Sequence, residues 1–400
     1  MENREWKTYL LNEISSKIGD GLHGTPKYDG NGDYYFINGN NLINGSIVFK
    51  EDTKTVTEEE FLKYRKDLND NSVLISINGT IGNLSFYRNE KVVLGKSAAY
   101  VNLLDTVDKK FVYYNFKSKF FQNYLVDIAT GTTIPNVPLK GLREYEIQLP
   151  PLPEQKAIAS VLSSLDDKID LLHQQNQTLE ALAETLFRQW FIVEAKEDWE
   201  EIKLGELVEI FNGVSYKSDD LNPSTTAMVT LKSFERNGEF RMDGFKEYTG
   251  KYKETHLVEE GDLVVAHTDI TQDAALIGNP VLVKSHSNYN KLIISMDLVK
   301  VVSKNSNFTN EFLYLLMKTR EFKEHALGYS NGSTVLHLSK KAIPEFELKL
   351  PPNELVNSFT ERVSALIKKQ FVNQKQIQTL TQLRDTLLPK LMSGEVRVKI

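Results

Sequence analysis

The chain has 400 residues, 40% of them apolar and 26% charged, which is too long for one ordinary hydrophobic core, so two or more domains are expected. The absence of cysteine excludes a disulfide scaffold, a thiolate zinc site and a cysteine nucleophile. A net charge of −6 argues against indiscriminate phosphate binding, because that affinity comes from lysine and arginine. An ordinary acidic protein has the same totals. If DNA is the partner, the cations must be concentrated on one face or supplied by another subunit.

The N-terminal segment MENREWKTYL lacks the apolar core of a signal peptide. No run approaches the roughly 18 to 20 apolar residues needed to cross a bilayer. We therefore expect a cytoplasmic protein with no contact to a membrane.

Residues 1–150 form the first expected domain. Short apolar runs at 72–79, 84–89 and 91–103, separated by Gly and Asn, predict short strands joined by turns. One amphipathic helix is expected at 110–129. This mixture predicts an α+β domain with irregular loops.

A long helix is expected at 151–195, after a proline-rich break. Its apolar residues recur at alternating steps of four and three, the spacing of a coiled-coil seam. About 38 helical residues extend roughly 57 Å, a spacer of fixed length. The seam positions are Ile158, Leu162, Leu165, Ile169, Leu172, Asn176, Leu179, Ala183, Leu186 and Trp190.

The second half repeats this order, with a domain at 196–351 and a helix at 352–400. The domain combines strand-like runs at 263–268, 274–283 and 291–301 with an amphipathic helix at 310–327, so it is also α+β. The second seam is Phe359, Val363, Leu366, Gln370, Asn373, Ile377, Leu380, Arg384, Leu387 and Leu391.

Asn176, Gln370 and Asn373 are polar residues within these seams. A single polar seam residue often fixes register and partner, so we interpret them as register or subunit-docking features. A frayed, partly solvated seam is the alternative.

An internal repeat underlies this order. Residues 131–187 align without gaps to 332–388, an offset of 201, and Trp6, Leu11 and Glu13 align to Trp199, Leu204 and Glu206, an offset of 193. Between these anchors the halves diverge, with GLHGTPKY and SINGTIGN in one and FNGVSYKS and VVAHTDITQD in the other. One architecture performing two different recognitions is indicated; duplication followed by neutral drift is the alternative.

Antiparallel pairing of the helices would relate the two domains by a pseudo-twofold axis. Such a body matches a split DNA site with two half-sites. The candidate contact loops are 19–28, 38–41, 96–100 and 130–136 in the first domain, and 212–217, 231–236, 267–272 and 328–335 in the second.

These loops carry residue types that bind base edges or phosphates, although Gly-Asn clusters also form plain turns. In the first domain the candidates are Asp20, His23, Thr25, Lys27, Tyr28, Asn38, Asn40, Asn41, Lys96, Ser97, Tyr100, Thr132, Thr133 and Asn136. In the second they are Asn212, Tyr216, Lys217, Lys232, Ser233, Arg236, His267, Thr268, Gln272, Ser333 and Thr334. Their different chemistry implies two different half-sites.

The run at 121–170, especially its GTT-P-N and PPLPEQ-IA motifs, resembles the junction of domain and helix in specificity subunits of type I restriction-modification systems. GDGLHGTPKY and NSVLISINGTIGN resemble their first recognition domain, and GDLVVAHTDITQDAALIGNPVLV resembles one version of the second. The likeness covers essentially the whole chain. At the second junction PPLPEQ is replaced by PPNEL (351–355) and Gly131-Thr132-Thr133 by Gly332-Ser333-Thr334, which weakens residue-level inference there.

The resemblance implies a non-catalytic subunit that binds double-stranded DNA together with two modification (methyltransferase) subunits and with restriction/translocase subunits. It places S-adenosylmethionine, ATP and Mg on those partners, with adenine methylated in each half-site, and no cofactor or metal on this chain. Two absences agree with it: no phosphate-loop motif, and no Asn-Pro-Pro-aromatic or Asp-Pro-Pro-aromatic motif.

Two other hypotheses stay open on the sequence. One is the recognition part of a nuclease-methyltransferase, which the missing catalytic motifs disfavour. The other is a two-headed adaptor of an anti-phage complex that binds all duplexes equally.

Overall fold

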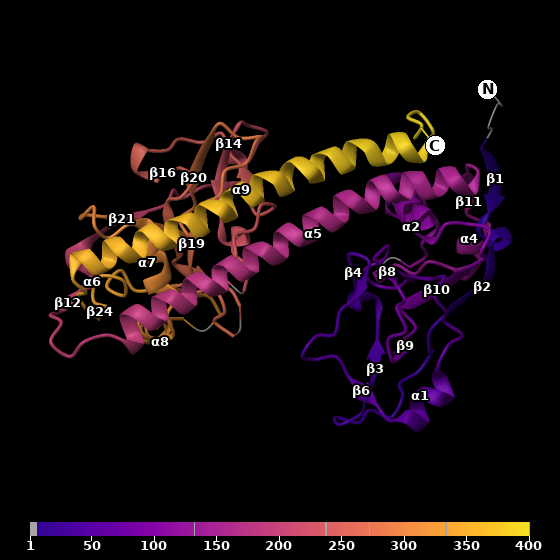
Figure 1. The fold of residues 1–400 in the computed structure, drawn as a ribbon, viewed down its shortest axis with the longest axis horizontal. Helices are drawn as coiled ribbons and strands as arrows, with labels where there is room; N and C mark the ends of the chain where they lie inside the picture. Colours follow the sequence, from indigo (N-terminus) through magenta and orange to yellow (C-terminus); the bar gives the residue numbers. More distant parts are fainter. Residues whose placement is uncertain (1–5, 132, 237, 272, 333, 400) are drawn as a thin grey trace. The chain divides into compact units, whose positions relative to one another are not determined.

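The computed structural model describes residues 6–131, 133–236, 238–271, 273–332 and 334–399 (Figure 1). The chain divides into two compact units: residues 1–171 with 377–400, and residues 172–376. Each unit therefore contains one domain and parts of both long helices, α5 (Leu152–Arg188) and α9 (Asn353–Met392).

The first unit is built on a four-stranded antiparallel sheet in the order β2-β10-β7-β8, with a smaller sheet β6-β3-β9 in which β3 and β9 are parallel. Two pairs, β1-β11 and β4-β5, complete it. Its strands are β1 Lys7–Leu10, β2 Ser15–Asp20, β3 Tyr34–Ile37, β4 Leu42–Ile43, β5 Ser46–Ile47, β6 Thr55–Val56, β7 Ser72–Ser76, β8 Leu84–Phe86, β9 Val92–Leu94, β10 Ala98–Leu103 and β11 Glu146–Leu149. Its short helices are α1 Glu58–Tyr64, α2 Lys109–Lys117, α3 Lys119–Ile128 and α4 Leu139–Glu144.

The second unit has the same plan, which confirms the internal repeat. Its antiparallel sheet has the order β13-β21-β17-β19, and its smaller sheet, β15-β14-β20-β16, again has one parallel pair, β14 with β20. A third sheet, β18-β23-β22, and the pair β12-β24 are added. The strands are β12 Glu201–Lys203, β13 Val208–Asn212, β14 Thr226–Val229, β15 Lys246–Glu247, β16 Leu257–Val258, β17 Leu263–Ala266, β18 Thr268–Asp269, β19 Pro280–Leu282, β20 Lys291–Ile294, β21 Leu298–Ser303, β22 Ser330–Asn331, β23 Leu336–Leu338 and β24 Glu347–Lys349. The short helices are α6 Leu204–Leu207, α7 Asn310–Met317 and α8 Arg320–Gly328.

The prediction of one amphipathic helix in each domain is wrong. The structure has two helices at each place, α2 and α3 in the first domain and α7 and α8 in the second. Ser118 and Thr319 have extended backbones, with ψ of 147° and 152°. Each side chain accepts a hydrogen bond from a backbone N–H of the next helix, Phe121 at 3.3 Å and Phe322 at 3.3 Å. A hydroxyl that caps a helix start ends the preceding helix at the same point.

The predicted seams of α5 and α9 are buried faces of these helices, because every seam position is buried or half-buried. Within the first unit Asp166 contacts Arg384, and within the second Asn176 contacts Asn373 and Glu180 contacts Gln370. In the second unit the residue number falls on α9 as it rises on α5, which is the pattern of antiparallel helices.

These helices also complete the core of each domain. Ile158, Leu162, Leu391 and Met392 are buried in the same cluster as the strands and short helices of the first unit. Phe187, Phe359 and Val363 do the same in the second unit. A helix stripe that packs on a domain and on another helix at once is wider than a two-stranded coiled-coil seam.

One half-buried carboxylate in each unit joins α5 to α9 and to a short helix. In the first unit Asp166 accepts hydrogen bonds from Tyr114 Oη (2.9 Å), Lys117 Nζ (3.1 Å) and Arg384 Nη1 (2.8 Å). In the second, Glu180 accepts from Tyr314 Oη (2.6 Å), Lys318 Nζ (2.6 Å) and Gln370 Nε2 (2.9 Å).

The ionised form of each carboxylate is favoured. Burial alone would raise the pKa of Glu180, but the charge of Lys318 and the hydrogen bonds from its neighbours outweigh it and hold the pKa below the usual value. The same balance lowers the pKa of Asp166, where the hydrogen bond from Arg384 is the largest opposing contribution to burial.

We predict that Glu180 stabilises the fold at neutral pH and loses that effect in acid. Because its folded pKa lies below the unfolded value of about 4.5, its contribution is present above that pH and falls as pH drops through the folded pKa. Urea denaturation of wild type and Glu180→Gln should give a difference in unfolding free energy that is largest near pH 7 and shrinks below about pH 4.5. The exposed Glu361→Gln is the control; a pH-independent difference for Glu180→Gln would contradict the assignment.

The polar seam residues form a small network. The Asn373 amide is fully buried, and its Nδ2 donates to Asn176 Oδ1 at 2.9 Å, while Gln370 Nε2 donates to the Asn176 carbonyl at 3.1 Å. Asn373 Oδ1 has no hydrogen-bond partner within the part of the chain that the structure describes. The network therefore costs stability compared with an apolar seam and favours one register.

We predict opposite effects for single and double replacements in this network. Asn176→Leu leaves the Asn373 amide buried without its partner and should lower the unfolding free energy by about 1–3 kcal/mol. Asn176→Leu with Asn373→Leu removes both amides and should restore or exceed wild-type stability. Thermal denaturation measures both, with the exposed Gln174→Leu as a control within about 0.5 kcal/mol of wild type. A double variant as unstable as the single would show that the amides do not act as a pair.

Candidate nucleic-acid interface

In the first unit Ser97, in the predicted loop 96–100, binds the predicted loop 38–41. Its hydroxyl donates to Asn38 Oδ1 at 3.0 Å and accepts from the Gly39 N–H at 2.9 Å, while its carbonyl accepts from the Ile77 N–H, just after β7, at 2.9 Å. The 19–28 loop joins through the Leu22 N–H, which donates to the Leu94 carbonyl at 2.7 Å. Loops that are distant in sequence are thus fixed at one edge of the domain.

The fourth loop, 130–136, is a hairpin tied to the end of β7. Thr130 and Asn136 exchange two backbone hydrogen bonds of 2.8 Å, and Asn78 Nδ2 donates to Asn136 Oδ1 at 3.1 Å. Gly131 has a φ of +95°, and a Cβ there would lie 2.6 Å from the Ile134 carbonyl oxygen. Only glycine fits this turn without strain.

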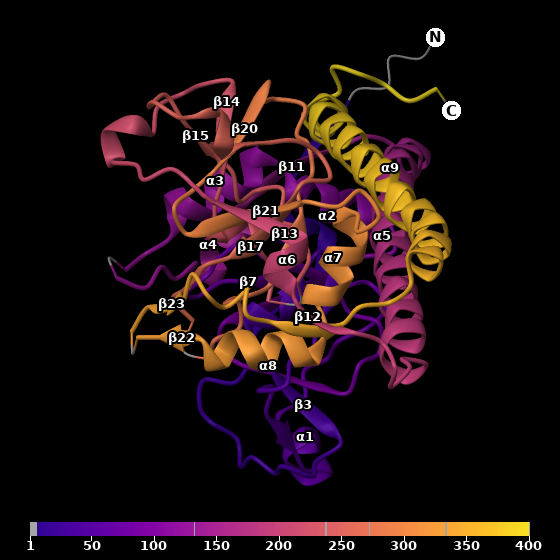
Figure 2. The same ribbon diagram turned by 90° about the vertical axis from the view of Figure 1, so that its left-hand side faces the viewer.

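The second unit repeats this arrangement. Asn331 and His337 pair as Thr130 and Asn136 do, and Gly332 has a φ of +122°. His337 also pairs with Thr268, the first residue of β18, as Asn136 pairs with Asn78. In Figure 2, β22 and β23 lie on the side of this unit away from its parts of α5 and α9.

The loop that corresponds to Gly95–Ser97 in the second unit is Ser295–Asp297, and the sequence analysis did not single it out. The Asp297 carbonyl accepts from the His267 N–H at 2.8 Å, and Asp297 Oδ1 accepts from the Thr268 hydroxyl at 3.0 Å. Met296, at the position of Lys96, is 52% exposed. The signal was present: KVVLGKSAAYVNL at 91–103 aligns with KLIISMDLVKVVS at 291–303.

Several predicted residues hold the loops together and do not face outward. Asn41 is buried, with its Nδ2 donating to the Val48 carbonyl and its Oδ1 accepting from the Asn38 N–H. Tyr100 and Ser233 are also buried, as is Thr268, whose hydroxyl is used by Asp297. We assign these four a structural role, since burial removes them from a base edge.

Other predicted residues are available at the surface. Their side chains are exposed at His23, Thr25, Lys27, Tyr28, Asn40, Lys96 and Thr133 in the first unit, and at Asn212, Lys217, Lys232, Arg236 and Thr334 in the second. Half-buried are Asp20, Asn38, Ser97, Asn136, Tyr216 and His267. Thr132, Gln272 and Ser333 lie outside the described residues.

Short ionic contacts orient some of these side chains. Asp20 Oδ2 lies 2.5 Å from His23 Nε2, and Arg236 Nη1 lies 3.2 Å from Asp273 Oδ2. The Arg236–Asp273 pair is exposed, so it contributes little to stability and leaves the Arg236 guanidinium free to reorient. Lys246 Nζ donates to Tyr216 Oη at 3.0 Å, which holds the Tyr216 ring.

His267 is held in its neutral form at pH 7. Burial lowers its pKa, the adjacent His337 and Lys340 lower it further, and Asp297 opposes them. A neutral imidazole offers both a donor and an acceptor, so it suits a base edge better than a phosphate.

A buried carboxylate shapes the turn beside His267. Asp269 accepts from the N–H groups of Leu276 (2.6 Å) and Ile277 (2.8 Å), and from the Thr271 backbone and hydroxyl. Burial would raise the pKa of Asp269, but these hydrogen bonds prevail and lower it. The Asp269 carboxylate therefore holds this turn in place, and we assign it a structural role in the loop and not a role in ligand binding.

Among the described residues, no group of His, Asp or Glu side chains is arranged to hold a metal ion. No helix there combines the length and apolar character needed to cross a membrane.

Comparison with known proteins adds to this geometry. The family model described as type I restriction modification DNA specificity domain matches residues 3–181 and 196–383. The MjaIX specificity subunit of Methanocaldococcus jannaschii is 26% identical over 423 residues, covering 99% of this chain and 94% of that protein. The HindI specificity subunit of Haemophilus influenzae is 23% identical over 468 residues, covering 98% and 100%.

A crystal structure of the type I restriction-modification S subunit from M. genitalium shares the fold. The likeness covers 100% of this chain and 98% of that one, with a TM-score of 0.60 at 21% identity. Since the family model matches most of the chain and falls on both halves of the repeat, the chain belongs to the type I restriction-modification DNA specificity family.

Proposed function

We propose that this chain reads an asymmetric DNA site in two parts, one with the loop cluster of each unit. The observation that carries the proposal is the repeat itself: the same sheets hold the same set of loops twice, but with different side chains. Lys96 stands where Met296 does, and Asn136 where His337 does. We therefore expect the two units, which share a framework but differ in their contact residues, to bind two different half-sites.

As a specificity subunit the chain is the non-catalytic member of its complex. We further propose two modification subunits, which carry S-adenosylmethionine and methylate one adenine in each half-site. Restriction/translocase subunits with ATP and Mg would complete the assembly. A net charge of −6 agrees with this division, because partner subunits would supply part of the lysine and arginine that bind phosphates.

We predict that deleting the gene in its host removes adenine methylation at one two-part, asymmetric motif. Long-read sequencing of the deletion and parent strains measures this across the genome. Restoring the gene on a plasmid should restore the motif. An unchanged methylome in a strain that expresses the active parental system would contradict the function and favour the adaptor.

We predict that one exposed lysine acts on one half-site only. Lys96→Ala should relax the preference at one position of the first half-site by about tenfold, because a good base contact contributes roughly 1–3 kcal/mol of discrimination. Binding of the complex assembled with modification subunits to a randomised duplex library measures it.

Lys140→Ala is the matched control, because Lys140 is an exposed lysine on α4, 83% accessible and outside the loop cluster. Arg236→Ala should change the other half-site and leave the first unaltered. Equal behaviour of Lys96→Ala and Lys140→Ala would exclude Lys96 as a base-reading residue.

A further inference from the structure

An apolar side chain stands at the tip of the loop hairpin in each unit. Ile134 is 59% exposed in the first unit, and Val335 is 37% exposed in the second. The two residues are separated by the 201 residues of the repeat and lie inside its aligned part, 131–187 and 332–388. Single exposed apolar residues are common on protein surfaces, so the place of this pair in the fold is the informative observation.

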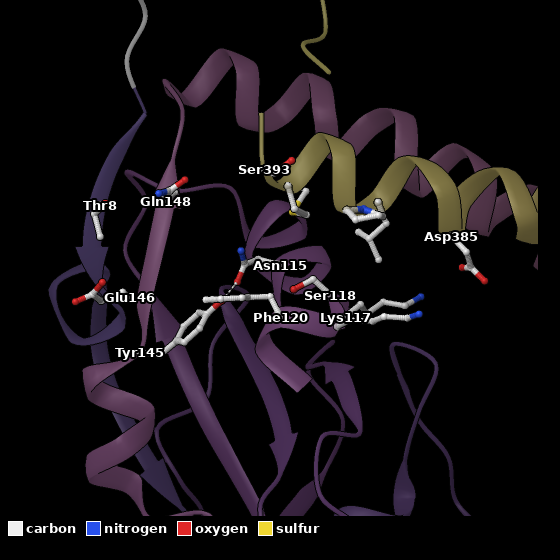
Figure 3. Close-up of a pocket in the computed structure, with 14 residues that line it drawn as sticks. Thr8, Asn115, Lys117, Ser118, Phe120, Tyr145, Glu146, Gln148, Asp385 and Ser393 are labelled. Atoms are coloured by element: carbon white, nitrogen blue, oxygen red, sulfur yellow. Dashed lines mark hydrogen bonds between the residues drawn. The ribbon is translucent and has the colours of Figure 1, made fainter. Parts of the chain in front are cut away.

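Other exposed apolar residues differ from the hairpin pair. Val126 and Leu327 have the same offset and are also exposed, but they lie on α3 and α8, outside the loop cluster. Phe120 is exposed on the wall of a cavity of about 680 Å³ (Figure 3), but Glu321 stands at its position in the second unit. The hairpin pair is apolar in both units and also lies among the loops proposed to bind DNA.

Both hairpins are anchored to the domain beneath them in the same way. The Val137 N–H donates to the Ile77 carbonyl at 2.8 Å in the first unit. The Leu338 N–H donates to the His267 carbonyl at 2.8 Å in the second. The residue before each donor, Asn136 or His337, closes the hairpin. The tip is therefore presented by a fixed support in each unit.

Each turn also closes on the backbone of its apolar residue. A Cβ at Gly131 would lie 2.6 Å from the Ile134 carbonyl oxygen. A Cβ at Gly332 would clash with the Val335 carbonyl oxygen in the same way. Branching at Cβ restricts both apolar side chains to few rotamers, so little conformational entropy is lost when they are buried against a ligand.

A feature shared by both units should act on something that both half-sites share. The polar loop residues differ between the units, so the bases that they read are expected to differ as well. Under the proposed function, each half-site contains one adenine that is methylated. A base inside a duplex has to leave the stack before an enzyme can act on it, and this extrusion costs stacking and pairing energy.

We propose that Ile134 and Val335 enter the duplex and fill the space that each target adenine leaves when it is extruded. Apolar side chains of this kind insert between base steps as wedges in DNA-bending proteins. The wedge replaces stacking contacts that the neighbouring bases lose, and it hinders the return of the adenine while the modification subunit acts. This inference rests on the proposed function and adds to it two residues that serve base extrusion and not sequence reading.

Fluorescence of 2-aminopurine tests the wedge, because its emission rises when the base leaves the stack. The full chain is assembled with modification subunits and bound to a duplex that carries its two-part motif, with 2-aminopurine replacing the target adenine of one half-site at a time. Wild type should give a rise at both half-sites. Ile134→Ser should lower the equilibrium constant for extrusion about tenfold at one half-site, the fold-change expected for loss of a buried aliphatic side chain, and Val335→Ser should do so at the other.

Matched variants serve as controls. Ile134→Val and Val335→Ile keep an apolar side chain at the tip and should retain the signal. Val126→Ser and Leu327→Ser remove exposed apolar residues at another pair of repeat positions and should also retain it. A mismatched base opposite the target lowers the cost of extrusion, so it should restore the signal of Ile134→Ser. All the substituted residues are exposed, so each variant should unfold at the wild-type temperature.

The outcomes separate the possibilities. Wild-type fluorescence in both serine variants would overturn the wedge while leaving the proposed function in place. Intact extrusion together with a changed base preference in a randomised duplex library would overturn it in favour of two base-reading residues. An assembled complex that selects no two-part motif would overturn the wedge and the proposed function together.

Discussion

The antiparallel packing of α5 against α9 is the constraint on which each domain depends. The sheets of a unit bury one face only after parts of both long helices cover the short helices beside them. In each unit one carboxylate then fixes how α5 and α9 pack, Asp166 in the first and Glu180 in the second. A carboxylate bonded from three directions tolerates little sliding, because any shift would leave a buried charge without its partners.

Much of this architecture could be predicted because it is periodic. The steps of four and three identified the seams, and the 201-residue offset identified the repeat. Strand-like runs beside an amphipathic segment indicated the α+β class of both domains. Breaks in a period were less visible: Ser118 and Thr319 look like ordinary helix residues, and only their cap geometry shows that each divides two helices. The parallel pairs β3-β9 and β14-β20 could not be predicted either, because strands that pair across a long stretch of sequence leave no local pattern.

The candidate interface was predictable as loops but not as side chains. Gly-Asn-rich composition selected the candidate loops, but it does not separate polar residues that face outward from polar residues whose hydrogen bonds hold the loops together. Asn38 and Asn41 are three residues apart, and only the second is fully buried by its bonds to Val48 and Asn38. Met296 was not predicted as a contact residue, because the methionine side chain lacks a strong hydrogen-bonding group. Its position in the repeat nevertheless matches that of Lys96.

The burial of Leu391 and Met392 in the core of the first unit has a consequence for biosynthesis. A ribosome makes the first domain long before it makes Leu391 and Met392, which close its core. Until α9 is made, the nascent domain exposes the apolar surface that this helix later covers. Folding of the N-terminal domain is therefore coupled to the synthesis of α9, and loss of α9 would impair the part of the protein that was synthesised first.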